Sequence, residues 1–170
     1  IPNEYFPVKD YSIVMLNGGR LWTKLIRRKF LVENNIKFIE GKKFEDNPYL
    51  PILYSYKPKI GKVNKAYYHY LYNSDSTSRK KNDYTIFDRL DTAIYMLEET
   101  KRIGVYNKFK EEINYLFIQF YYANTIVACI TRFDKLQIDY IKKVYKDVNK
   151  ILPNYRNNVY LKSAPYYIKV

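Results

Sequence analysis

The chain has 170 residues, of which 47% are hydrophobic, and this suffices for one domain with its own core rather than two. Lysine and arginine total 30 against 17 acids, and the resulting charge of +13 favours anionic partners such as phosphates, nucleic acid or an acidic membrane face. The lone Cys129 excludes an intrachain disulfide, and with a single histidine it argues against a zinc cluster.

Other features of the composition bear on location. No uninterrupted apolar run is long enough to span a bilayer, and the first residues lack the shape of a signal peptide. A reducing, cytoplasmic setting fits best. The abundance of Lys, Asn, Ile and Tyr also matches the codon usage of an AT-rich genome, so charge alone does not choose a partner. The start at Ile1, without an initiator methionine, suggests a fragment or a processed chain.

The first part of the chain predicts short elements. Residues 12–16 fit either a short strand or a helical turn, and they end at the turn signal Asn17-Gly18-Gly19. From residue 20 to residue 34 the apolar residues recur at helical spacing, with cations mostly on the other side. Residues 36–39 are typical of a short extended segment.

An acidic pair, Glu45-Asp46, follows a lysine-rich turn and precedes Asn47-Pro48. Proline suits the first position of a helix, and asparagine suits the cap before it. The pattern therefore predicts a helix from Pro48 to about Tyr56, with the acidic pair just ahead of its N-terminus and at the mouth of a cleft.

The remaining chain predicts strands first and helices afterwards. Residues 59–66 alternate basic and apolar side chains, and residues 67–72 continue as an aromatic strand, followed by a polar loop over 73–78. Three apolar stripes then predict helices over about 86–104, 109–130 and 134–151, packed as a bundle with Cys129 buried. Together these patterns predict an α+β fold that is mostly α-helical.

The acidic pair has two interpretations. In the first, Glu45 and Asp46 are charges that stabilise a helix start by about 0.3–1 kcal/mol each. In the second, Asp46 is a general base beside a bound hydroxyl. A helix N-terminus lowers the pKa of a carboxylate, which weakens it as a base. Spacing alone favours the first interpretation.

Five further residues are candidates for substrate binding, and each also has a structural interpretation. His69 lies among tyrosines, where a single histidine is more often a hydrogen-bonded structural residue. Ser76 and Arg79 could cradle a phosphate, although most such loops are only solvated. Trp22 fits plain core, and Lys24 lies on the polar side of its predicted helix. The cations at 27–29 fit a solvated helix face or a contact with an anionic membrane.

The order of these motifs resembles a known family. The P-loop, G-x-G-x-x-G, H-E-x-x-H, G-x-S-x-G and D-x-D motifs are all missing. The run W-T-K-L-I-R-R from Trp22, then E-N-N-I-K-F, a glycine, F-E-D at 44–46, a tyrosine strand and S-T-S-R at 76–79 resembles the C-terminal half of bacterial family-two glycosyltransferases. These are inverting enzymes of the GT-A fold that act in cell-surface polysaccharide assembly. The match covers about a third of the chain, from residue 22 to residue 79.

The resemblance implies roles for the candidate residues. Asp46 would deprotonate the acceptor hydroxyl with Glu45 as its partner, and the attack would displace a nucleotide diphosphate and invert the anomeric centre. Ser76 and Arg79 would belong to a loop over the donor diphosphate, while Trp22 and Lys24 would build the floor of the acceptor side. His69 lies in the tyrosine strand of the motif. A nucleotide sugar and a glycan or lipid-linked acceptor would be the substrates.

The resemblance also implies an organisation. Residues 1–82 would be the acceptor-side part of a GT-A-type α/β catalytic domain, and residues 83–170 a C-terminal helical region. The half that binds the nucleotide would be missing, together with the acidic ligands of Mg²⁺ or Mn²⁺, so these residues alone should not catalyse transfer. Where the family often has arginines in the tyrosine strand, this chain has Leu71 and Asn73, which weakens the case for diphosphate binding there.

The location implied is cytoplasmic, peripheral to the inner face of an anionic membrane. Two alternatives from other classes stay open. One is a nucleic-acid-binding module in which lysines follow phosphates while tyrosines stack on bases. The other is a helical interaction domain without chemistry, in which the acidic pair only caps a helix. Because most tyrosines fall within apolar stripes, core packing explains them and a nucleic-acid partner is not expected.

Overall fold

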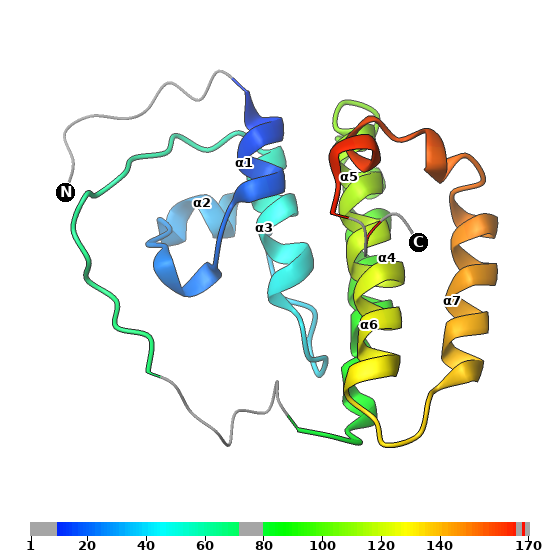
Figure 1. The fold of residues 1–170 in the computed structure, drawn as a ribbon. Coiled ribbons are helices and arrows are strands. Elements are labelled where there is room, and N and C mark those ends of the chain that lie inside the picture. Colours follow the sequence, from blue (N-terminus) through cyan, green and yellow to red (C-terminus); the bar gives the residue numbers. More distant parts are fainter. Residues whose placement is uncertain (1–9, 72–79, 166–167, 169–170) are drawn as a thin grey trace.

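The computed structural model describes residues 10–71, 80–165 and 168, and throughout these residues the regular structure is helical (Figure 1). None of the residues described belongs to a β-strand or a sheet. The expectation of an α+β fold that completes a GT-A-type α/β domain is therefore wrong for this part of the chain.

The N-terminal part holds three α-helices. They are α1 (Tyr11–Asn17), α2 (Arg28–Glu33) and α3 (Asp46–Ser55), with a 3-10 helix at Leu21–Thr23. The stretch at 12–16, which the sequence left open between strand and helix, is helical. Asp10 caps α1 by accepting a hydrogen bond from the backbone N–H of Ser12 at 2.8 Å.

The C-terminal part forms the bundle that the apolar stripes predicted. After a 3-10 helix at Tyr84–Phe87 come α4 (Asp88–Arg102), α5 (Lys110–Phe117), a π-helical segment (Ile118–Ala123), α6 (Asn124–Thr131) and α7 (Ile138–Ile151). Two 3-10 helices, Tyr155–Asn157 and Val159–Ser163, follow. Cys129 is fully buried, as expected.

The core lies between α4, the continuous helix from α5 through α6, and α7 (Figure 1). Its fully buried side chains include Met96, Ile113, Phe117, Val144 and Val148. On the other side of α4 packs α3, and α1 packs against both α3 and α5. The N-terminal helices therefore form an additional layer that is seated on the bundle.

The helix predicted over residues 20–34 is interrupted. The chain makes a 3-10 turn at 21–23, runs extended through Lys24, and becomes α-helical only at Arg28. Thr23 Oγ1 and Lys24 Nζ both donate to the carbonyl oxygen of Arg20, at 2.7 Å each. Such local side-chain bonds compete with the helical hydrogen-bond ladder. Leu25, predicted to face a core, is fully exposed.

The strands predicted at 36–39, 59–66 and 67–72 are not found within the described residues. Residues 57–71 run as an extended, mostly exposed arc that swings away from the helices (Figure 1). Alternation of side chains predicts a strand only when a neighbouring strand supplies hydrogen bonds and an apolar face. The described part of this fold offers no such neighbour.

The helix Lys110–Thr131 is long and apolar enough to cross a membrane by length and composition alone, although no single apolar run in the sequence suggested it. Of the most apolar stretch of this helix, 56% is buried inside the protein. Burial against α4 and α7 explains its apolar character as that of a core helix.

The turn after α1 is held by a close approach of Gly18 to α3. A Cβ placed on Gly18 would lie 2.5 Å from Cε2 of Tyr54 and 2.8 Å from the carbonyl oxygen of Val14. Its φ of −61° suits any residue, so the restriction is steric. The next residue, Gly19, has a φ of +70°, which favours glycine.

Gly18→Ala should lower the free energy of unfolding by about 1–3 kcal/mol, because the added methyl group forces α1 away from α3. Chemical denaturation measures the change, and Asn17→Ala in the last turn of α1 serves as the control. An unchanged stability of the Gly18 variant would contradict the packing of α1 on α3.

Candidate active site

The lysine-rich turn ahead of the acidic pair is fastened to the start of α4. Lys43 Nζ lies 2.8 Å from Oδ2 of Asp83, and its backbone N–H donates to Oδ2 of Asp88 at 3.1 Å. Lys42 Nζ lies 2.6 Å from Oδ2 of Asp91 and 3.5 Å from Oδ1 of Asp88. Two acids in the first turn of α4 and one that caps the preceding 3-10 helix thus hold two adjacent lysines, and this fixes the approach of the chain to α3.

An arginine completes the attachment. The guanidinium of Arg89 lies 4.4 Å from the ring centroid of Phe44, in cation–π contact, and donates to the carbonyl oxygens of Ile86 and Asn124 at 2.9 and 2.7 Å. Burial, followed by the charge of Arg132, lowers the pKa of Arg89 to about 10. Phe44 adopts a φ of +63°, so the contact holds an uncommon backbone conformation immediately before the acidic pair.

Glu45 and Asp46 lie at the N-terminus of α3, as predicted, but neither lines the groove between α4 and α7 or the one beside Leu152, so the predicted cleft at this position stays a prediction. The capping detail differs from the prediction, since the helix begins at Asp46 rather than Pro48 and its cap position is Glu45, which makes no side-chain capping bond. Asn47 is therefore a residue of the first turn and not the cap. Asp46 enters the helix with its carboxylate beside the exposed amides of that turn.

The environment of Asp46 raises the pKa of its carboxylate. Burial is the largest cause, and the negative charge of Glu45 adds to it, while the backbone amides of Asp46 and Asn47 and the charge of Arg20 act in the opposite direction. The sequence predicted that the helix N-terminus would lower the pKa of Asp46. That prediction is wrong, because the net change in the pKa is upward. Among the described residues Asp46 forms no ion pair. It is a half-buried carboxylate whose pKa is raised chiefly by burial, and such shifts are common at functional sites.

Arg20 connects the acidic pair to Trp22. Its charge acts on Asp46, and its guanidinium lies 5.5 Å from the ring centroid of Trp22. Trp22 in turn stacks on Tyr70, with ring centroids 5.7 Å apart and an interplanar angle of 21°. Arg20 is thus the residue that Trp22 and Asp46 have in common, and at 40% exposure the Trp22 ring lies partly at the surface rather than in the core.

Lys24 lies beside the same turn. Besides its bond to the Arg20 carbonyl, its Nζ donates to Oγ1 of Thr23 at 3.4 Å. Partial burial lowers the pKa of Lys24. Trp22 and Lys24 therefore lie on the same turn after Arg20, and their contact with an acceptor stays a prediction.

The other candidates stand apart from this group or outside the description. His69 is exposed in the extended arc, next to the Tyr70 that stacks on Trp22. Ser76 and Arg79 lie outside the described residues, so their predicted contact with a diphosphate stays a prediction. The described residues contain no group of three or more His, Cys, Asp and Glu side chains that could hold a metal ion.

Sequence reasoning missed Arg20 and Tyr70. The pairing of Trp22 with Tyr70 joins residues 48 positions apart, and neither periodicity nor spacing carries a signal for it. For Arg20 a signal existed, because it directly follows the Gly18-Gly19 turn that brings α1 close to α3.

Comparison with known proteins gives one informative match. A cholesterol galactosyltransferase of Borreliella burgdorferi is 29% identical to this chain over 105 residues. The match covers 61% of this chain and 28% of that protein, so the chain spans less than a third of its relative's length. No family model and no solved structure matches the chain. Similarity to a glycosyltransferase is thus found, while membership of family two stays a prediction.

The raised pKa of Asp46 predicts a pH-dependent stability. In the folded chain this carboxyl binds a proton more readily than in the unfolded chain, so its ionisation opposes folding above the raised pKa. The opposition fades as the pH falls towards the ordinary value of 3.8. Asp46→Asn should therefore raise the melting temperature slightly at pH 7, and the gain should shrink at pH 4.

Thermal unfolding at the two pH values measures this effect. The matched control is Asp139→Asn, which also removes an acid from the first turn of a helix but at an exposed position. A loss of stability at pH 7 for the Asp46 variant, equal to that of the control, would show that its charge is not unfavourable in the fold.

Proposed function

We propose that this chain is part of a glycosyltransferase that moves a sugar from a nucleotide-sugar donor to an acceptor hydroxyl, with inversion of the anomeric centre. The observation that supports it most is Asp46, a half-buried carboxylate of raised pKa that is free of ion pairs within the described residues. The relative from Borreliella burgdorferi, named for galactosyl transfer, supports the reaction class.

In the proposed reaction Asp46 accepts the proton of the acceptor hydroxyl as its oxygen forms a bond to the anomeric carbon. The bond from that carbon to the donor's diphosphate oxygen breaks, and the nucleoside diphosphate leaves with the electron pair. Attack from the opposite face inverts the configuration. A raised pKa makes Asp46 a better proton acceptor than an ordinary aspartate. The pKa-lowering effect of the helix N-terminus is thereby outweighed.

The neighbours of Asp46 have supporting roles in this proposal. The charge of Glu45 raises the basicity of Asp46. The exposed ring of Trp22, fixed between Arg20 and Tyr70, offers the acceptor an apolar surface. Lys24 lies close enough to the same turn to donate a hydrogen bond to an acceptor oxygen. Ser76 and Arg79 are proposed to contact the donor diphosphate, and His69 the bound substrate.

The wider setting is also proposed. The acceptor is a glycan or lipid-linked glycan of the cell surface, met at the cytoplasmic face of an anionic membrane that the basic chain contacts. Mg²⁺ or Mn²⁺ stays an expectation for the part of the enzyme that binds the nucleotide. Since the described residues hold no metal-ligand group, no step here is assigned to a metal.

In the protein that carries this chain together with its donor-binding part, Asp46→Asn should reduce transfer by about 10³-fold, because the amide of asparagine cannot accept the proton of the acceptor hydroxyl. Release of nucleoside diphosphate from UDP-sugars, with cholesterol and glycolipid acceptors, measures it. Donor affinity should not change. Retained turnover would remove Asp46 from the mechanism.

Glu45→Gln is the companion variant. Because it removes a negative charge that raises the pKa of Asp46, it should keep most of the activity while moving the acidic limb of the pH–rate profile to lower pH. A shift to higher pH, or complete loss of activity with the fold intact, would contradict the assigned role of Glu45.

Nucleic-acid binding is the second candidate, and the exposure of Tyr67, Tyr68 and Tyr70 beside lysines in the extended arc favours it more than the sequence did. We expect no tight binding of a single-stranded oligothymidylate at 150 mM salt. A fluorescence anisotropy titration over several salt concentrations measures this. Submicromolar binding that weakens steeply with salt would favour this candidate over sugar transfer.

A further inference from the structure

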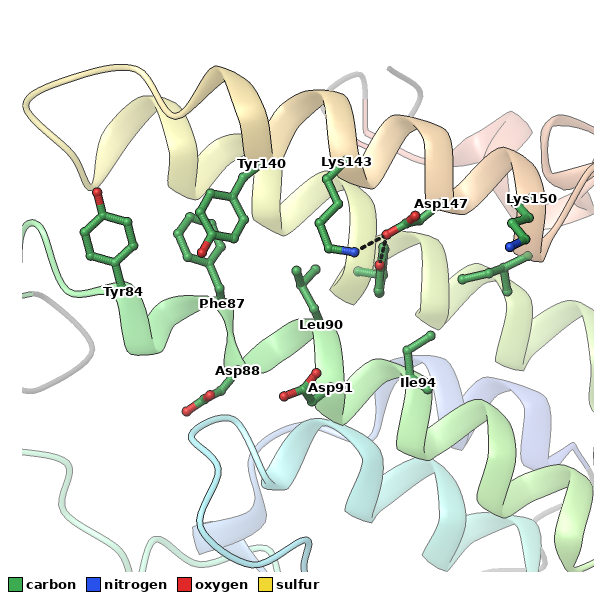
Figure 2. Close-up of a pocket in the computed structure, with 12 residues that line it drawn as sticks. Tyr84, Phe87, Asp88, Leu90, Asp91, Ile94, Tyr140, Lys143, Asp147 and Lys150 are labelled. Atoms are coloured by element: carbon green, nitrogen blue, oxygen red, sulfur yellow. Dashed lines mark hydrogen bonds and ion pairs between the residues drawn. The ribbon is translucent and has the colours of Figure 1, made fainter.

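A groove of about 620 Å³ runs between α4 and α7, on the side of α4 opposite the acidic pair's helix (Figure 2). None of the predicted site residues lines it. Its size is in the range of small-molecule sites. Its base is contributed by the π-helical segment, through Tyr121. Short π-helical segments within α-helices occur frequently at functional sites.

One end of the groove is aromatic. Phe87 and Tyr140 stack with ring centroids 3.5 Å apart and an interplanar angle of 3°, so each ring fixes the other. Tyr84 stands at the mouth with 57% exposure, held by ring contact with Phe133 at 5.1 Å and by a hydrogen bond from its hydroxyl to Gln137 Oε1 at 3.4 Å. These rings present a rigid, partly open aromatic surface.

The other end of the groove carries a hydrogen-bonded set of polar groups. The Tyr121 hydroxyl donates to Oδ2 of Asp147 at 2.6 Å, and Lys143 Nζ pairs with the same oxygen (Figure 2). Burial and the bond to Asp147 raise the pKa of Tyr121, so its hydroxyl stays protonated. Lys150 lies further along the same wall. Both donors and acceptors of hydrogen bonds therefore face the groove.

The charges of the groove nearly cancel. Asp147 is paired with Lys143, and Lys150 lies further along α7, while the carboxylates of Asp88 and Asp91 point towards the turn before α3 and pair with Lys42 (Figure 2). A polyanion such as a nucleotide would meet the carboxylates without a surplus of cations. A neutral ligand with many hydroxyl groups can use every group present, since its C–H faces carry partial positive charge that suits the negative face of an aromatic ring.

We propose that the groove between α4 and α7 is a saccharide-binding subsite, with the sugar ring against Tyr84 and Tyr140 and its hydroxyl groups on Asp147 and Lys143. As a place for the acceptor glycan it rests on the proposed function. Lys42, which is paired to the acidic wall of the groove, is four residues from Asp46, a chain length of at most about 14 Å. The edge of the groove and the acidic pair are therefore connected by a short stretch of chain.

The test is direct binding of lactose and maltotriose to the chain at millimolar sugar. Changes in ¹H–¹⁵N NMR chemical shifts and calorimetry measure the binding. Either sugar should shift the amide signals of residues around the groove. Tyr84→Ala should weaken binding about fivefold, as expected for loss of one aromatic contact. The matched control is Tyr145→Ala, an equally exposed tyrosine of α7 that does not line the groove.

Equal weakening by both tyrosine variants, or no shift at the groove with either sugar, would overturn the proposal. Binding of UDP at the groove in place of the sugars would also overturn it and make the groove an anion site. Asp46→Asn should bind the sugars normally. If the chain does not bind the sugars but transfer depends on Asp46, the groove proposal alone is rejected. If the chain binds the sugars but transfer does not depend on Asp46, the proposed function alone is rejected.

Discussion

The burial of α3 is the constraint on which the site depends. Every residue of this helix from Pro48 to Ser55 is buried between α1 and α4, so the helix has no solvent face along most of its length. A helix enclosed in this way cannot rotate or slide without exposing apolar surface at roughly 25 cal/mol per Å². Its first residue, Asp46, is therefore held at one depth, and that depth produces its raised pKa.

The lysine-rich turn before α3 also helps to hold Asp46 in place. Surface ion pairs usually stabilise a protein by no more than about 1 kcal/mol each, so Lys42 and Lys43 contribute less to overall stability than to geometry. By pairing with acids of α4 and the turn before it, they fix the segment that leads to Glu45. Two acids placed side by side at partial burial are unfavourable by themselves. The packing of α3 between α1 and α4 offsets that cost.

The sequence predicted what depends on local pattern and missed what depends on distant partners. The helices of the bundle, the burial of Cys129 and the position of the acidic pair at a helix start follow from periodicity and from the proline after Asn47. The prediction of strands was wrong because alternating side chains at 59–66 form a strand only beside a neighbouring strand, which the sequence pattern cannot show. The prediction of one continuous helix over 20–34 was wrong because the side chains of Thr23 and Lys24 both donate to the backbone carbonyl of Arg20.

The pKa of Asp46 was beyond prediction for a related reason. The helix dipole can be read from sequence, but desolvation depends on how deeply α3 is inserted, and in this structure desolvation is the stronger effect. The distribution of charge supports the same conclusion. Residues 57–71 contain four lysines and no acid, so four charges of the surplus of +13 lie on the exposed arc. Near Asp46 the lysines of the turn are paired with acids, which leaves this half-buried carboxylate without an ion pair among the described residues. A basic protein can therefore keep a carboxylate of raised pKa, because the lysines of the nearby turn are paired with other acids and four more lysines lie on the exposed arc.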